Sequence, residues 1–68
     1  METIVLNVTG MSCEHCVRAV TNAVGELQGV SGVAVSLENN TATVTYDAGK
    51  VSPDDVKASI EFEGYEVV

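Results

Sequence analysis

Cysteine, proline, aromatic residues and basic residues are all scarce in this chain of 68 residues. It has two cysteines, one proline, no tryptophan, two tyrosines and one phenylalanine. The cysteines, Cys13 and Cys16, are so close in sequence that a disulfide between them would close only a tiny loop. They cannot form the disulfide framework of a secreted mini-protein, so we consider them candidates for chemistry or for metal binding.

Positive charge is also sparse, because three basic residues stand against ten acidic ones and the net charge is −7. Such a charge repels phosphate backbones and anionic lipid surfaces. We therefore expect neither nucleic acid nor a membrane surface as a direct partner. A partner surface should be basic, or at least tolerate a strongly acidic face, and encounter should be faster at low salt.

Long apolar runs are absent, whereas a membrane-spanning helix needs about 20 apolar residues. Residues 1–3 lead directly into a strand pattern without the basic region of a signal peptide, so we expect a cytoplasmic protein. A length of 68 residues allows one domain, over residues 1–68, and excludes a cleft between two lobes.

The first half of the chain changes from an alternating to a helical pattern. Residues 3–9 alternate apolar and polar side chains and are rich in β-branched residues, which predicts a strand ending at Gly10. Spacings of three and four then predict a helix over residues 13–28, with Gly29 as its stop. The inward face of this helix should consist of Val17, Val20, Val24 and Leu27.

The second half returns to a period of two and then to a helix. Residues 30–37 and 42–46 alternate around Asn39-Asn40, which predicts a β-hairpin over residues 33–46. Ser52-Pro53-Asp54-Asp55 is typical of a helix start, and Gly64 should end that helix, with Val56 and Ile60 facing inward and Phe62 near its end. A short strand over residues 65–68 follows.

The resulting order is β-α-β-β-α-β. Two βαβ units with right-handed crossovers, joined by a hairpin, predict an α+β fold of the ferredoxin-like type. In this βαββαβ sandwich, one four-stranded antiparallel sheet carries both helices on one face.

The candidate chemistry lies in residues 10–16, Gly-Met-Ser-Cys-Glu-His-Cys, between the first strand and the first helix. Cys13 should lie in the loop and Cys16 in the first helical turn. Unpaired backbone N–H groups and the helix dipole favour negative charge there and lower the pKa of a thiol. Both sulfurs should therefore be thiolates near neutral pH, which is the form that binds metal.

Thiolate ligands select soft ions, namely Cu(I), zinc or iron–sulfur clusters. Structural zinc and iron–sulfur clusters take about four protein ligands, and this chain has two cysteines and one histidine in total. Cu(I) is satisfied by two sulfurs and leaves room for a third. A partner thiolate can then add to the bound ion before one original Cu–S bond breaks, so that the metal is never released to water.

The segment Gly-Met-Ser-Cys-Glu-His-Cys within this β-α-β-β-α-β pattern resembles the heavy-metal-associated domain family, and within it the free-standing bacterial copper chaperones. The likeness runs from the first strand through Gly64-Tyr65. It implies a Cu(I) carrier that delivers copper to the similarly folded domains of a copper-transporting P-type ATPase, and in some members to a copper-responsive repressor. It also implies that some members form a copper-bridged homodimer.

The resemblance further implies a role for particular residues. Cys13 and Cys16 are the expected metal ligands, Met11 anchors the loop, and Tyr65 lies beside it. A serine before Cys13, where zinc-exporting relatives tend to carry an aspartate, favours copper. The strongly acidic charge departs from relatives that dock through a lysine-rich face.

Other roles remain open for several of these residues. His15 is either a third donor in a copper-bridged dimer or a solvent-facing histidine, and Met11 is either a soft ligand or a core residue beneath the loop. Tyr65 could instead be an edge-strand aromatic that covers Phe62 or the first helix. Glu14 and Arg18 are expected to be a favourable first-turn charge and a solvated helix residue.

Two other functions remain as alternatives to a metal carrier. A thioredoxin-like dithiol enzyme would also use a Cys-x-x-Cys pair, although the flanking Trp-Cys-Gly-Pro-Cys pattern is missing. A detached regulatory domain of a heavy-metal transporter would look similar, although the chain from Met1 to the strand after Gly64 fits a complete short protein better.

Overall fold

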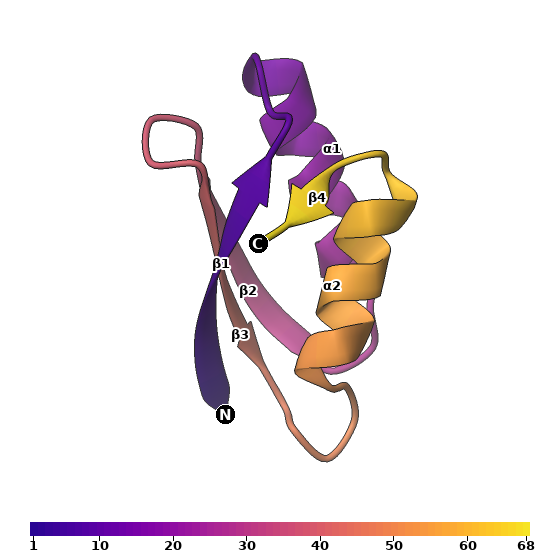
Figure 1. Ribbon diagram of the computed structural model, residues 1–68. Coiled ribbons are helices and arrows are strands. Elements are labelled where there is room, and N and C mark those ends of the chain that lie inside the picture. Colours follow the sequence, from indigo (N-terminus) through magenta and orange to yellow (C-terminus); the bar gives the residue numbers. More distant parts are fainter.

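Strands and helices follow one another in the order β1-α1-β2-β3-α2-β4 in the computed structural model, which describes residues 1–68 (Figure 1). The bounds are β1 Glu2–Thr9, α1 Glu14–Gly25, β2 Val30–Ser36, β3 Thr41–Tyr46, α2 Pro53–Phe62 and β4 Glu66–Val67. The predicted βαββαβ order is confirmed. None of the helices has the length and hydropathy needed to cross a bilayer.

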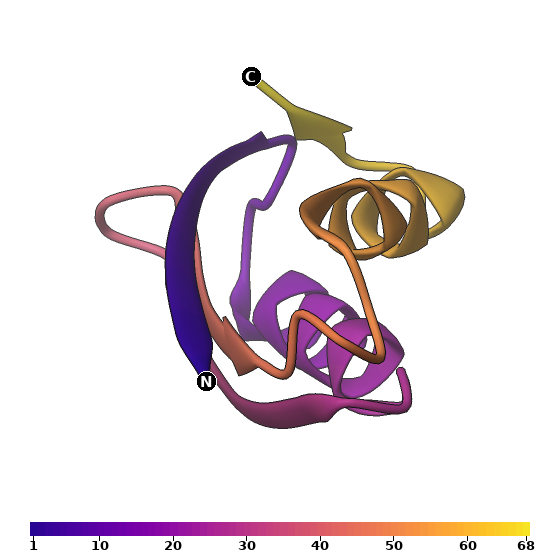
Figure 2. The ribbon, with the colours of Figure 1, turned by 90° about the horizontal axis from the view of Figure 1, so that it is seen from below.

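The sheet has the strand order β2-β3-β1-β4, and every neighbouring pair is antiparallel. The register of β1 and β3 sets Ile4 opposite Val44 and Leu6 opposite Ala42, so the apolar positions of both strands share one face. Seen along the strands, α1 and α2 lie on that same side of the curved sheet (Figure 2). The predicted ferredoxin-like sandwich is therefore confirmed.

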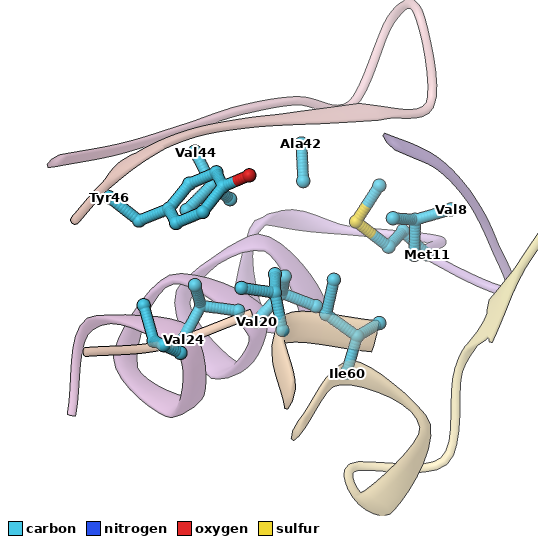
Figure 3. Close-up of a cluster of buried hydrophobic side chains, with 10 residues drawn as sticks. Val8, Met11, Val20, Val24, Ala42, Val44, Tyr46 and Ile60 are labelled. Carbon is cyan, nitrogen blue, oxygen red and sulfur yellow. The ribbon is translucent and has the colours of Figure 1, made fainter. Parts of the chain in front are cut away.

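The core is small and consists mainly of aliphatic side chains from the sheet and both helices (Figure 3). The largest fully buried side chains come from β1, α1, β3 and α2: Val8, Val20, Val24, Val44, Val56 and Ile60. Val17 and Leu27, at the two ends of the predicted stripe, are half-buried. The predicted inward faces of both helices are thus correct. Phe62, in contrast, is 88% exposed, so Tyr65 does not cover it.

The predicted end of the first helix was wrong by three residues, because α1 stops at Gly25 rather than at residue 28. After that point the N–H of Leu27 donates to the carbonyl of Val24 at 3.1 Å, a tighter turn than the α-helix makes. Leu27 still packs against the core from this turn. Its apolar side chain therefore fitted the helical spacing in the sequence, although the helix has already ended. Gly29 then adopts a φ of +103° and turns the chain into β2.

Gly29 provides a first prediction, because a side chain cannot fit there. A Cβ at Gly29 would lie 2.7 Å from the Lys50 Cβ and 3.2 Å from Val51 Cγ1, in a backbone conformation that favours glycine. Gly29→Ala should lower the free energy of unfolding by about 1–3 kcal/mol. Gly25→Ala is the matched control: its Cβ would meet nothing within 4 Å, and alanine favours the helix end by up to about 1 kcal/mol. In urea unfolding, Gly29→Ala should lower the free energy of unfolding and Gly25→Ala should raise it. Equal changes in the two variants would contradict this steric explanation.

The second helix begins as predicted. The Ser52 side chain accepts from the Asp55 backbone N–H at 3.2 Å, and the Ser52 N–H donates to the Asp55 carboxylate at 3.0 Å, which completes a capping box. Gly64 takes a φ of +97° after the helix. The short strand β4 then pairs with the end of β1, Val8 opposite Val67, and this pairing brings Tyr65 to the loop between β1 and α1.

Candidate metal centre

The two thiols lie at the N-terminal tip of α1, where β1 has just ended. Cys13 is the residue that caps the helix, with an extended backbone, and its side chain is exposed. Its carbonyl accepts the N–H groups of Cys16 at 3.1 Å and Val17 at 3.3 Å, which closes the first turn. Cys16 is half-buried in that turn, and both thiols are free. The helix therefore starts where the sequence predicted, with one cysteine before its first residue and the other inside it.

Met11 lies beneath this loop rather than at its surface. Its side chain is 7% exposed and packs in the core beside Val8 (Figure 3). A buried thioether holds the loop down by hydrophobic contact and is not presented to an ion at the surface. Gly10, just before it, has a φ of +95°, and a Cβ there would lie 3.4 Å from Tyr65 Cδ1. The loop thus passes close to the Tyr65 ring.

The electrostatics of the site favour a thiolate at Cys16. Its pKa is lowered from 9.0 to about 6, chiefly by a hydrogen bond from the Ser12 backbone and then by one from the Tyr65 hydroxyl. The Ser12 side chain also contributes, with its Oγ 3.9 Å from Cys16 Sγ. The same contact with Cys16 raises the pKa of Tyr65 above its ordinary value of 10.0, because the phenol is needed as a donor. Hydrogen bonds from Ser12 and Tyr65 therefore support one sulfur anion.

Titration of Cys16 tests this arrangement. In a Cys13→Ser background, the rate of alkylation of Cys16 should rise with pH around a midpoint of about 6. Tyr65→Phe should move that midpoint upward, yet leave it below 9.0, because the Ser12 backbone bond remains. Tyr46→Phe removes the other tyrosine hydroxyl, in the core, and should leave the midpoint unchanged. An unchanged midpoint in Tyr65→Phe would show that the hydroxyl does not support the thiolate.

This shift also links the site to stability. Folding lowers the pKa of Cys16, so its thiolate stabilises the fold; that contribution is complete above pH 9.0 and disappears as the pH falls through about 6.

The remaining candidates do not gather around the sulfurs. Glu14, His15 and Arg18 are all exposed on α1. Nowhere in the chain do three or more side chains of His, Cys, Asp or Glu come close enough to hold one metal ion. Within one chain the cysteine pair therefore has no neighbouring group that completes a closed site of four ligands.

Sequence reasoning missed the contribution of Ser12 to the thiolate. Its side chain stands four residues before Cys16, and its backbone lies at the point where the loop turns into the helix. A small polar residue directly before a capping cysteine is the only signal of that role in the sequence.

The profile of the heavy-metal-associated domain family matches residues 5–66, which include the whole loop and nearly the whole fold. This chain belongs to the heavy-metal-associated domain family. One similar protein, the copper chaperone CopZ of Bacillus subtilis, is 54% identical over 67 residues, covering 98% of this chain and 97% of the relative. The sequence similarity thus extends over nearly the whole length of both chains.

Two solved structures of similar proteins superpose closely. A CopZ metallochaperone has a TM-score of 0.97 and 45% identity, covering 98% of this chain and 100% of that one. A copper binding domain from HMA7, a P-type ATPase, also has a TM-score of 0.97, with 37% identity, covering 100% of this chain and 92% of that one. The same fold therefore occurs in a metallochaperone and in a copper binding domain of a P-type ATPase.

Proposed function

We propose that this protein is a copper chaperone that binds Cu(I) between Cys13 and Cys16 and passes it to a metal-binding domain of a copper-transporting P-type ATPase. It acts as a carrier and not as an enzyme, and residues 1–68 form one heavy-metal-associated domain. Copper is its cargo.

The observation that carries this proposal is the pair of free thiols at the tip of α1, one exposed and one half-buried, with no third ligand grouped with them. Two thiolates satisfy Cu(I), whereas a structural zinc site needs about four ligands. The similarity to copper chaperones over nearly the whole chain agrees with this choice of metal. A pair of free thiols also suits the reducing cytoplasm, where we place the protein.

Transfer follows from the open side of the site. Because Cys13 is exposed, a thiolate of the acceptor can approach the ion from solvent and add a third sulfur to it. The bond from copper to one of the two original sulfurs then breaks, and the second acceptor thiolate takes its place. The bond to the remaining original sulfur breaks last, so that copper ends on the two acceptor sulfurs. No electron moves in these steps, and the departing cysteine sulfur leaves as a thiolate or takes up a proton. The similar fold of the acceptor domain, as in the HMA7 ATPase, allows two such loops to meet.

Transfer kinetics test this mechanism. The protein is loaded with Cu(I) without oxygen and mixed with an isolated two-cysteine domain of a copper-transporting P-type ATPase. Ligand exchange predicts a transfer rate that rises in proportion to the acceptor concentration. A rate independent of that concentration would mean that copper must first dissociate, and it would rule out the proposed exchange. An acceptor with both cysteines replaced by serine is the control and should receive no copper.

The same site allows two further associations that the family resemblance implies. A copper-responsive repressor would receive the ion by the same exchange of thiolates. In a copper-bridged homodimer, the exposed His15 would lie near the ion of a second copy, where it is a candidate additional donor. The dithiol alternative is tested by insulin reduction, in which a metal carrier should show no sustained turnover.

A further inference from the structure

A groove of about 830 Å³ runs between α1 and α2, and the metal site does not use it. The two helices lie side by side on one face of the sheet (Figure 2), and their inward residues, among them Val20 and Ile60, are already buried in the core. The groove is lined by other positions of the two helices and by residues 26–28, 50–51 and 63, which lie just outside them. Of its 13 lining residues only Val51 is buried, so the groove opens to solvent.

Six of the residues that line this groove are apolar. Ala19, Ala23 and Leu27 follow one another at intervals of four along the α1 side, and all three remain partly accessible to solvent. Ala58 and Phe62 contribute from α2, and the Phe62 side chain is 88% exposed. Small side chains allow another backbone to approach closely, and an exposed aromatic ring provides a large contact area.

The charged residues that line the groove favour a basic occupant. Glu26, Asp55 and Glu63 stand against a single base, Lys50. A second copy of this chain, with its net charge of −7, would bring acid against acid. A small polar ligand would find no buried polar side chain to orient it. The occupant that matches the groove is therefore a protein segment with an apolar stripe bordered by positively charged residues.

We propose that the groove between α1 and α2 is a docking surface for a basic amphipathic helix of a partner protein. The apolar stripe of that helix lies over Ala19, Ala23 and Ala58 and against the Phe62 ring, while its lysine or arginine residues face Glu26 and Glu63. This is a second contact surface, which needs neither cysteine. It binds whether or not copper is present, so it can hold a partner while the loop exchanges metal.

The test uses the full chain carrying Cys13→Ser and Cys16→Ser, so that its outcome does not depend on the metal site. A synthetic peptide of leucine and lysine at helical spacing is titrated into it, and backbone amide shifts are followed by NMR. Shifts should concentrate on residues 19–28, 50–51 and 55–63. A peptide of the same composition in scrambled order, without an apolar face, should bind at least about tenfold more weakly. No binding, or shifts centred on the opposite face of the sheet, would overturn the proposal.

Two pairs of variants separate the groove from general attraction of charge. Phe62→Ser should weaken binding by about tenfold, whereas Val5→Ser, at another exposed apolar residue outside the groove, should not change it. Glu26→Gln with Glu63→Gln should weaken binding more than Glu38→Gln with Glu66→Gln, which gives the same net charge but lies outside the groove. Equal weakening by both charge pairs would show that only the overall charge attracts the peptide.

Discussion

Replacing both Cys13 and Cys16 by serine is expected to abolish tight Cu(I) binding and to leave the fold unchanged. The two sulfurs are the only soft donors at the surface of the loop, since the Met11 thioether is buried in the core. Loss of a residue that only supports a metal ligand lowers the metal affinity about 10- to 100-fold. Loss of both ligands themselves should lower the Cu(I) affinity far more. Neither cysteine belongs to the buried core, so the domain should stay folded, and its urea midpoint should fall only by the loss of the stabilising contribution of the Cys16 thiolate.

Competition for Cu(I) against a chelator of known affinity measures the binding, and circular dichroism measures the fold. His15→Ala serves as the control, because it changes an exposed side chain between the two cysteines that forms no metal-binding group with them. It should keep the binding of one Cu(I) per chain. A double serine variant that competed for copper as well as the parent would place the metal elsewhere.

Val24→Asp should have the opposite effect and unfold the domain. Val24 is fully buried between α1 and the sheet, and no acidic or basic side chain lies buried beside it to pair with a carboxylate. An unpaired buried charge costs about 3–5 kcal/mol. At about 0.05–0.15 kcal/mol per residue, a chain of 68 residues has little more stability than that to lose. The variant should be largely unfolded at room temperature by circular dichroism.

Asn22→Asp is the matched control for this prediction, because it adds the same carboxylate at an exposed position two residues away on the same helix. It should change the free energy of unfolding by no more than about 0.5 kcal/mol. If Val24→Asp unfolded at the same urea concentration as Asn22→Asp, the inward face assigned to α1 would be wrong.

The sequence predicted the fold well because most elements carry a clear period. Alternation in residues 3–9 and 42–46 predicted strands, and the segment Ser52-Pro53-Asp54-Asp55 predicted the start of the second helix. Its prediction failed at the end of α1, where Leu27 contacts the core from a turn and so imitates another helical position. Periodicity records which side chains are buried, and it does not record which backbone conformation buries them.

The site was only partly predictable for a similar reason. A cysteine pair at a helix start can be found from sequence, and so can the lowered pKa that a helix tip gives a thiol. The chief cause of the Cys16 shift, the Ser12 backbone, is local, but the second comes from far along the chain, since Tyr65 reaches the loop only because β4 pairs with the end of β1. The exposure of Phe62 was equally hidden, because nothing in a local pattern shows that two helices leave a groove between them.

X-ray absorption at the copper edge tests the central claim most directly, namely that this loop holds Cu(I) by two sulfurs and keeps its coordination shell open. At low protein concentration and less than one copper per chain, we predict a first shell of two sulfur atoms. Addition of a small thiol should raise this number to three without loss of copper from the protein. A shell already closed by four donors, or one dominated by nitrogen or oxygen, would contradict the copper carrier described here.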